Sequence, residues 1–230
     1  MSGVLDWLAQ LRWEWLLETA VMAAAAILCI TFHETCHGLA ALALGDPTAK
    51  RAGRLSLNPM KHLDPMGLLM MLVAKVGWAK PVPIDPRRFR NPKVGMAVSA
   101  LAGPVSNILL AVLLTGCYGV CLFCYFVTEK TWLWYTVLFF HTSALLSEGL
   151  AVFNLLPIPP LDGSKVLFSI LPERLYWKLM RYERYGMLAL VVLLLSGSLD
   201  GLLNIMRGWI SQLTEPVGAW AFYLIQSLYF

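Results

Sequence analysis

Hydrophobic residues in this chain are gathered into long runs that are separated by polar segments. Apolar runs near or above about 18 residues are typical of helices that cross a bilayer. We predict spans at about 16–45, 94–127, 132–156 and 185–205, and a tail at 208–230 that forms a fifth crossing or a surface helix. The pattern therefore predicts an all-α polytopic membrane protein with a bundle of about four to six membrane helices.

The polar segments between the predicted spans differ in character. Residues 1–15 mix charged residues with tryptophans and favour an interfacial helix. In the long loop at 46–93, an alternating pattern predicts a small membrane-associated β element after the first span, formed by Arg54, Leu55, Ser56, Leu57 and Asn58. The apolar run 67–78 is too short to cross and favours a re-entrant or interfacial helix. We predict one domain over residues 1–230, with a core at 16–163 and C-terminal helices at 164–230.

Composition supports the membrane assignment and narrows the function classes. Hydrophobic residues make up 58% of the chain and charged residues 14%, whereas soluble domains have roughly 45–50% and about 25%. This excludes a soluble enzyme, a disordered tail and a disulfide-stapled secreted module. The net charge of +4 lies in loops rather than on one face, so we expect no nucleic-acid partner. Nothing in the pattern indicates an oligomeric state.

Basic residues predict the orientation. Fifteen of the eighteen Lys and Arg residues lie in the loop 50–93 and in the segment 165–184. Both segments fall on the same side when the spans are counted, and the positive-inside rule makes that side cytoplasmic. The first span is then expected to run from outside to inside.

The first predicted span contains an HExxH motif, formed by His33, Glu34 and His37. The spacing of four residues places both imidazoles on one helix face, which suits one zinc ion. Glu34 lies beside that face and can hold and deprotonate a water molecule bound to the metal. Ionisable side chains inside a span are costly unless they face a cavity and have a function, so we interpret the motif as a metal site.

Zinc at a catalytic site needs a third protein ligand, and Asp162 is the candidate. It follows the proline-rich end of the third span, where the backbone is extended and Gly163 permits a turn. The predicted topology places His33, His37 and Asp162 at a similar depth, near the cytoplasmic side. The spacing of Ser99 and Gly103 also predicts that the second span packs closely on the first.

Four motifs in this order resemble the site-2 protease family of intramembrane zinc metalloproteases, specifically its short forms without a PDZ or CBS domain. His33–His37 is similar to the family's HExxH, and Asn154–Gly163 to its NxxPxPxLDG pattern with the Asp as third zinc ligand. Arg54–Gly67 is similar to the stretch after the catalytic helix, and Gly103–Asn107 to a GPxxN segment. The resemblance covers the chain from the first span through Gly163.

The resemblance implies one Zn²⁺ per chain and cleavage of the transmembrane helix of another protein within the lipid bilayer. Glu34 is then the general base, and a single-span membrane protein is the substrate. Asn154 and Asn107 could donate hydrogen bonds to the oxyanion or to the substrate backbone, or could bond between helices instead. The predicted strand at 54–58 could pair with an unwound substrate. We expect a multi-pass protein of a prokaryotic plasma (inner) membrane, with its active site toward the cytoplasm.

Three other functions use the same residues. A zinc transporter or sensor would need a continuous path of acidic or His residues, and the outer halves of the spans offer little beyond His141 and Glu148. An inactive scaffold would be expected to lack one member of the HExxH and Asp set. A hydrolase acting on a lipid or a prenylated peptide is compatible with HExxH, although the proline-rich Asp segment favours a protease.

Overall fold

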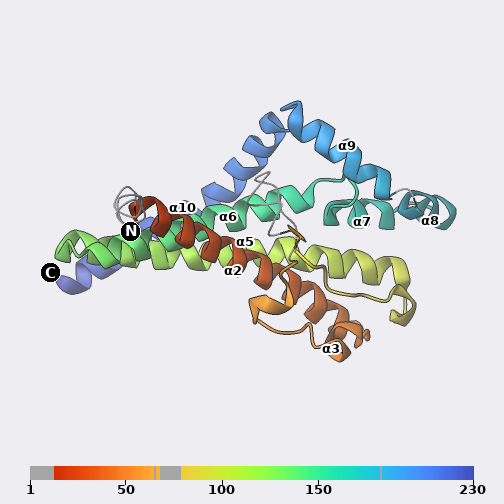
Figure 1. Ribbon diagram of the computed structural model, residues 1–230, viewed down its shortest axis with the longest axis horizontal. Coiled ribbons are helices and arrows are strands. Elements are labelled where there is room, and N and C mark those ends of the chain that lie inside the picture. Colours follow the sequence, from red (N-terminus) through yellow and green to blue (C-terminus); the bar gives the residue numbers. More distant parts are fainter. Residues whose placement is uncertain (1–12, 65, 68–78, 182) are drawn as a thin grey trace, which may run out of the picture.

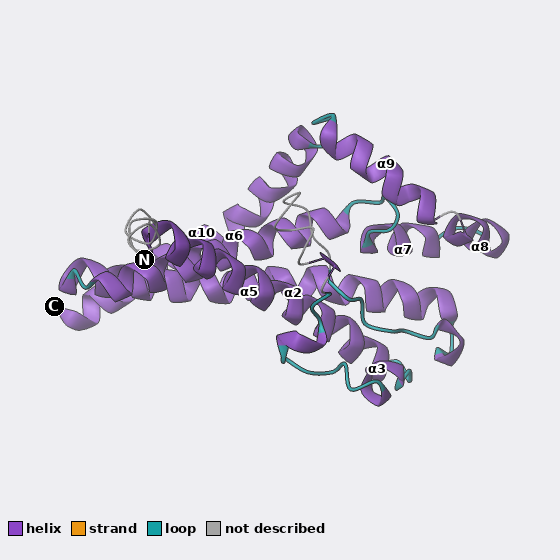
Figure 2. Cartoon of the chain, viewed as in Figure 1, coloured by secondary structure: helices purple, strands orange, loops and turns teal. Residues whose placement is uncertain are grey.

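The computed structural model describes residues 13–64, 66–67, 79–181 and 183–230. Most of the helix predicted at 1–15 and of the helix predicted at 67–78 lies outside these residues. Helices and loops make up the described part of the chain, as Figure 2 shows. The fold is therefore helical, as the hydrophobic runs predict.

Three long helices form the bundle: α2 (Trp13–Ala43), α5 (Pro92–Thr128) and α6 (Thr131–Leu155). Each is long and apolar enough to cross a membrane, which confirms the first three predicted spans. They lie side by side along the longest axis of the molecule (Figure 1). At the start of α5, the Asn91 side chain accepts a hydrogen bond from a backbone N–H of the first turn. Glu129, in the left-handed conformation, ends α5.

The C-terminal region corrects the predicted fourth span. Instead of one helix at 185–205, α9 (Glu183–Leu195) and α10 (Asp200–Tyr229) meet at a bend of 89°. Gly197, with φ +67°, lies in the turn between them, a conformation that favours glycine. Pro216 lies inside α10 and does not end it. Counted as one bent span, this pair raises the number of candidate crossings from three to four.

α10 returns along the bundle and packs against α5 and α6 (Figure 1). A Cβ added at Gly119 of α5 would lie 2.1 Å from the carbonyl oxygen of Gly218 on α10, so the two backbones meet where both residues are glycine. On α6, the buried Glu148 carboxylate accepts hydrogen bonds from Thr214 and Ser211 and lies 3.8 Å from Arg207 Nε. The close contact of Gly119 with Gly218 and the hydrogen bonds to the Glu148 carboxylate therefore hold α10 against α5 and α6.

Glu148→Ala is expected to weaken the attachment of α10. It leaves two hydroxyl donors without their acceptor and Arg207 without its carboxylate, at a cost of about 1–2 kcal/mol. The apparent Tm in detergent should fall by about 2–8 °C. Glu148→Gln keeps an acceptor oxygen and should lose less. An alanine variant as stable as the glutamine variant would contradict this role for Glu148.

The connecting segments contain short helices: α3 (Thr48–Arg51), η1 (Pro59–Lys61), η2 (Pro86–Arg88), α7 (Asp162–Ser169) and α8 (Glu173–Arg181). The predicted strand at 54–58 is not a strand in the structure. In the described part of the chain, β pairing is limited to an isolated bridge between Leu63 and Ala79. The carbonyl of Ser56 accepts hydrogen bonds from the side chains of Thr35 and His62, not from a neighbouring strand.

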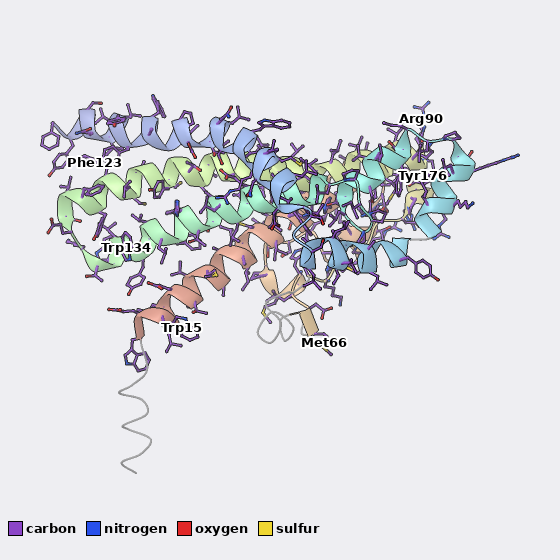
Figure 3. All side chains as sticks on the ribbon, turned by 90° about the horizontal axis from the view of Figure 1, so that it is seen from above. Trp15, Met66, Arg90, Phe123, Trp134 and Tyr176 are labelled. Carbon is purple, nitrogen blue, oxygen red and sulfur yellow. The ribbon has the colours of Figure 1, made fainter. Side chains whose placement is uncertain are left out.

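The two ends of the bundle differ in chemistry. Figure 3 shows Trp15 and Trp134 toward one end and Arg90 toward the other. Both tryptophans are exposed, as expected for aromatic side chains at a membrane–water interface. Arg90 belongs to the loop 46–93, which carries most of the basic residues, so the arrangement agrees with a bundle that crosses a membrane.

Candidate metal centre and active site

Three buried side chains from two elements converge on one point. His33 and His37 lie on successive turns of α2, and Asp162 begins α7. The Nε2 atoms of the two histidines are 2.9 Å apart. Asp162 Oδ2 is 3.3 Å from His33 Nε2 and 3.1 Å from His37 Nε2. Among the described residues, this is the group of His, Cys, Asp and Glu side chains that could hold a metal ion.

The spacing of these atoms fits zinc. Tetrahedral ligands at about 2.0–2.1 Å from zinc lie about 3.3 Å from one another, close to the observed separations of 2.9–3.3 Å. His37 Nδ1–H donates to the Ser99 carbonyl at 2.7 Å. This leaves the lone pair of His37 Nε2 facing His33 Nε2, an arrangement that a cation between them stabilises. The three side chains could therefore hold one Zn²⁺ and leave its fourth position open.

Local sequence explains how Asp162 reaches the histidines. α6 ends at Leu155, and the proline-rich segment after it turns the chain back toward the bundle. A Cβ added at Gly163 would lie 2.2 Å from the Leu155 carbonyl oxygen, so this return requires glycine. Burial raises the pKa of Asp162, but the close contacts of its carboxylate with the His33 and His37 imidazoles outweigh burial and hold the pKa well below its usual range. The carboxylate is therefore ionised at neutral pH, as a metal ligand must be.

Gly103 allows α5 to approach the two histidines. A Cβ at this position would lie 2.4 Å from His37 Cε1 and 2.5 Å from His33 Cε1. Ser99, one turn earlier, supplies the carbonyl that orients His37. The close packing predicted from the Ser99 and Gly103 spacing is confirmed.

A cavity of about 190 Å³ lies beside this cluster. Glu34, Asn154 and Lys165 line it together with His33, His37 and Asp162. Its remaining wall includes Pro81, Val82 and Ile84 from the extended segment 80–85, which we call the strap. Glu34 Oε2 accepts a hydrogen bond from the Val82 N–H at 2.9 Å. The three candidate metal ligands, the Glu34 carboxylate and the cavity therefore form one site.

Comparison with known proteins agrees with this geometry. The family model described as "Peptidase family M50" matches residues 119–197. The protein named "Putative zinc metalloprotease YwhC" of Bacillus subtilis is 39% identical over 173 residues, which are 73% of this chain and 76% of that protein. The chain belongs to peptidase family M50, the site-2 protease family. It is a zinc metalloprotease and a multi-pass membrane protein.

Two mycobacterial relatives support the same assignment. Both are named "Putative zinc metalloprotease Rip2". The protein of Mycolicibacterium smegmatis is 30% identical over 191 residues, 78% of this chain and 68% of its own length. The protein of Mycobacterium tuberculosis is 29% identical over 208 residues, 87% of this chain and 78% of its own length. No solved structure matches the chain.

The two asparagines predicted as hydrogen-bond donors have different positions in this M50 protein. Asn154 lines the cavity, and its side-chain amide donates one hydrogen bond to the Leu150 carbonyl at 3.0 Å. Asn107 is fully buried, does not line the cavity, and its side-chain amide has no partner among the described residues. This placement does not support the predicted contact between Asn107 and a substrate.

The segment 54–58, predicted as a substrate strand, makes contacts within the protein other than strand pairing. Arg54 is buried, and its guanidinium donates to backbone carbonyls of the strap. Leu55 lies against Gly38 of α2, whereas Leu57 is exposed. The Asn58 side chain accepts a hydrogen bond from the Met60 N–H and caps η1. The Ser56 carbonyl accepts from the side chains of Thr35 and His62. Leu55 and Ser56 therefore hold this segment on α2, and Arg54 connects it to the strap that lines the cavity.

Sequence reasoning missed two features of the site. Lys165 Nζ lies 3.3 Å from Asp162 Oδ1, and a lysine three residues after the ligand on a helix start was a signal that could have indicated it. The strap also lay in the long polar loop without a motif of its own. Its Pro81-Val82-Pro83 sequence favours an extended backbone, but nothing in it indicated contact with Glu34.

The far end of the strap is fixed by Asp46. This fully buried carboxylate accepts from the Asp85 N–H at 2.7 Å and from the Thr48 N–H at 2.9 Å, and lies 3.7 Å from Arg88 Nε. Burial raises the pKa of Asp46, but hydrogen bonds from Thr48 and Asp85 outweigh it, so the pKa lies below its ordinary value. The folded protein therefore stabilises the ionised form of Asp46.

Asp46 is expected to make stability depend on acid pH. Its contribution is present above the unfolded pKa of about 3.9 and is lost as the pH falls through the lower folded value. Asp46→Asn should lower stability at pH 7 by roughly 1–3 kcal/mol, and its difference from the wild type should narrow below about pH 4. Apparent Tm measured from pH 3 to 8 checks this. A constant difference across that range would contradict it.

Proposed function

We propose that this protein hydrolyses a peptide bond within the transmembrane segment of another membrane protein. The observation that carries the proposal is the position of the site. His33, Glu34 and His37 belong to α2, which is one of the candidate membrane spans, and they line the cavity that Asp162 closes from α7. A metalloprotease whose catalytic helix crosses the bilayer meets its substrate at membrane depth.

The chemistry follows from the positions of the side chains. Zinc held by His33, His37 and Asp162 would supply a Lewis acid that polarises the scissile carbonyl and lowers the pKa of a water molecule. Glu34 takes the proton from the attacking water and passes it to the leaving amine. Its Oε2 accepts from the Val82 N–H, and its Oε1, which has no hydrogen-bond partner among the described residues, is assigned to this transfer.

Asn154 is assigned to the oxyanion. One N–H of its side-chain amide is bonded within α6, which fixes the amide at the cavity wall. The other N–H is left to stabilise the negative charge that develops on the carbonyl oxygen.

A substrate helix must unwind before its peptide bond can react, because each backbone group in a bilayer helix is already hydrogen-bonded. A single-span protein is the simplest substrate, since its helix has no neighbours to retain it. We assign the basic loops to the cytoplasm on the positive-inside rule. The site then opens toward the cytoplasmic side of a prokaryotic inner membrane, from which water enters.

Reconstituted protein tests the proposal. The purified chain in liposomes, with a panel of single-span proteins, is expected to cleave at least one of them and to leave a soluble unfolded protein intact. A zinc chelator should abolish cleavage, and added zinc should restore it. Bound zinc without cleavage of any membrane substrate would overturn the proposal and favour a zinc transporter or sensor.

A further inference from the structure

The strap crosses the catalytic helix in an extended conformation, and hydrogen bonds to several described residues hold it. The Lys80 N–H donates to the His62 carbonyl at 2.8 Å. The Lys80 and Pro81 carbonyls accept from the Arg54 guanidinium, the Val82 N–H donates to Glu34, and the Asp85 N–H donates to Asp46. The middle contact is to the carboxylate at the cavity. The strap therefore connects Arg54 to Glu34.

We propose that Arg54 is a positioning residue that holds the Val82 N–H against the Glu34 carboxylate and so orients that carboxylate for proton transfer. The proposal rests on the assignment of Glu34 as general base under the proposed function. It goes beyond that assignment by giving the base a fixed orientation and naming the residues that impose it.

The environment of Arg54 suits this role. The side chain is 8% exposed, and its Nη2 donates to two successive carbonyls of the strap, one of them at 3.2 Å. Its Nε is buried without a hydrogen-bond partner among the described residues. Burying a guanidinium is costly, and here its charge strengthens two hydrogen bonds to the strap. An apolar residue of similar size would fill the space without that cost.

The strap can present one donor at this point. Prolines lack an N–H group, so Pro81 and Pro83 leave the Val82 N–H as the sole backbone donor of the three residues. The prolines also fix the backbone on both sides of Val82. The Val82 N–H is bonded to Glu34 Oε2 at 2.9 Å, and this fixes which carboxylate oxygen remains free.

α2 provides the surface on which the two loop segments meet. Gly38 lies one turn after Glu34, and a Cβ there would lie 2.5 Å from Leu55 Cδ2 and 3.1 Å from Val82 Cγ1. Thr35 Oγ1 donates to the Ser56 carbonyl at 3.1 Å. The segment that carries Arg54 and the strap are therefore both docked on the helix turn next to Glu34.

Two pairs of variants separate orientation of the base from packing. Val82→Pro removes the N–H, and Val82→Ala keeps it while trimming the side chain. Arg54→Gln removes the charge, and Arg54→Lys keeps it. A displacement near 1 Å at a catalytic group can cost about 100-fold, so we expect Val82→Pro and Arg54→Gln to lower kcat by about 10–100-fold. KM and zinc content should change little, and Arg54→Lys should recover part of the loss.

Hydrogen exchange measures the contact without cleavage. In a peptide that covers the strap, the Val82 amide has no exchanging neighbour at positions 81 and 83. We expect this amide to be protected in the wild type, in zinc-loaded and zinc-free protein alike. Glu34→Ala and Arg54→Gln should both remove the protection, because the first deletes the acceptor and the second releases the strap.

The outcomes are distinct. An unprotected Val82 amide in the wild type, or protection that survives Arg54→Gln, would overturn the inference. A rise in KM at unchanged kcat for Arg54→Gln would also overturn it and would make Arg54 a substrate contact. If the wild type cleaves no membrane protein, the proposed function fails, and the exchange pattern still decides whether Arg54 positions the strap on Glu34.

Discussion

Asp162→Ala should abolish zinc binding and proteolysis together. The carboxylate supplies one of three protein atoms within 3.3 Å of one another, and two histidines alone do not complete a catalytic zinc site. Loss of partners that only orient a metal ligand costs about 10–100-fold in metal affinity, so loss of a ligand should cost more than about 100-fold.

Metal analysis of the purified variant checks this expectation, together with competition against a chelator of known affinity. Lys165→Met is the matched control, since it removes the neighbour of Asp162 and leaves the three ligands in place. The Lys165→Met protein should retain zinc, and its loss of zinc affinity should be smaller than that of Asp162→Ala. An Asp162→Ala protein that binds zinc as tightly as the wild type would show that another residue completes the site.

Glu34→Gln should separate metal binding from catalysis. Glutamine has nearly the same shape and still offers an oxygen to the Val82 N–H, but it cannot take up a proton from water. General base catalysis contributes typically 10²–10⁴-fold, so kcat/KM should fall by about that factor while zinc content is unchanged. Single-turnover cleavage of a membrane substrate, with zinc measured on the same preparation, gives both quantities.

The variants Glu34→Gln and Asp162→Ala together distinguish a general base from a zinc ligand, which a measurement of activity alone does not. Both should lose at least about 100-fold in cleavage rate, but only the second should lack zinc. Glu34→Gln that retains wild-type cleavage would contradict the assignment of the base. Glu34→Gln that loses zinc would instead place Glu34 among the ligands.

The features that the sequence predicted depend on local pattern. Each of the first three spans is a long and mainly apolar run, and the spacing of His33 and His37 alone places both rings on one face of α2. Asp162 could be predicted as a ligand because the prolines before it end α6 at a fixed point, near the depth of the histidines. Gly103 was recognisable as a small residue one turn from Ser99. These predictions require no knowledge of distant contacts.

The features that were missed depend on contacts between distant segments. Hydropathy averages over residues and carries no sign of the 89° bend at Gly197. Pro216 lies inside α10 and does not end it, because a proline is tolerated in a helix that neighbouring helices support. The alternation at 54–58 arises because Leu55 packs on Gly38 while Leu57 is exposed, and not from strand pairing.

The strap, at the active site, also depends on contacts between distant segments that the sequence pattern does not indicate. Its contact with Glu34 joins residues 48 positions apart in the chain, and no spacing rule connects a loop amide to a helix carboxylate. Arg54 was assigned to the substrate because it lies in an alternating segment. Its burial and its two carbonyl partners are properties of the folded chain, and they support the proposal that Arg54 positions the strap.

The position of the cleaved bond tests the central claim most directly. A single-span substrate should be cleaved in liposomes by the wild type and by Glu34→Gln in parallel, and the intact masses of the products should be measured. Cleavage within the membrane should give product ends that fall inside the hydrophobic span, and these products should be lost in the Glu34→Gln reaction. Product ends confined to the exposed flanks of the substrate, or products that form equally with Glu34→Gln, would contradict it.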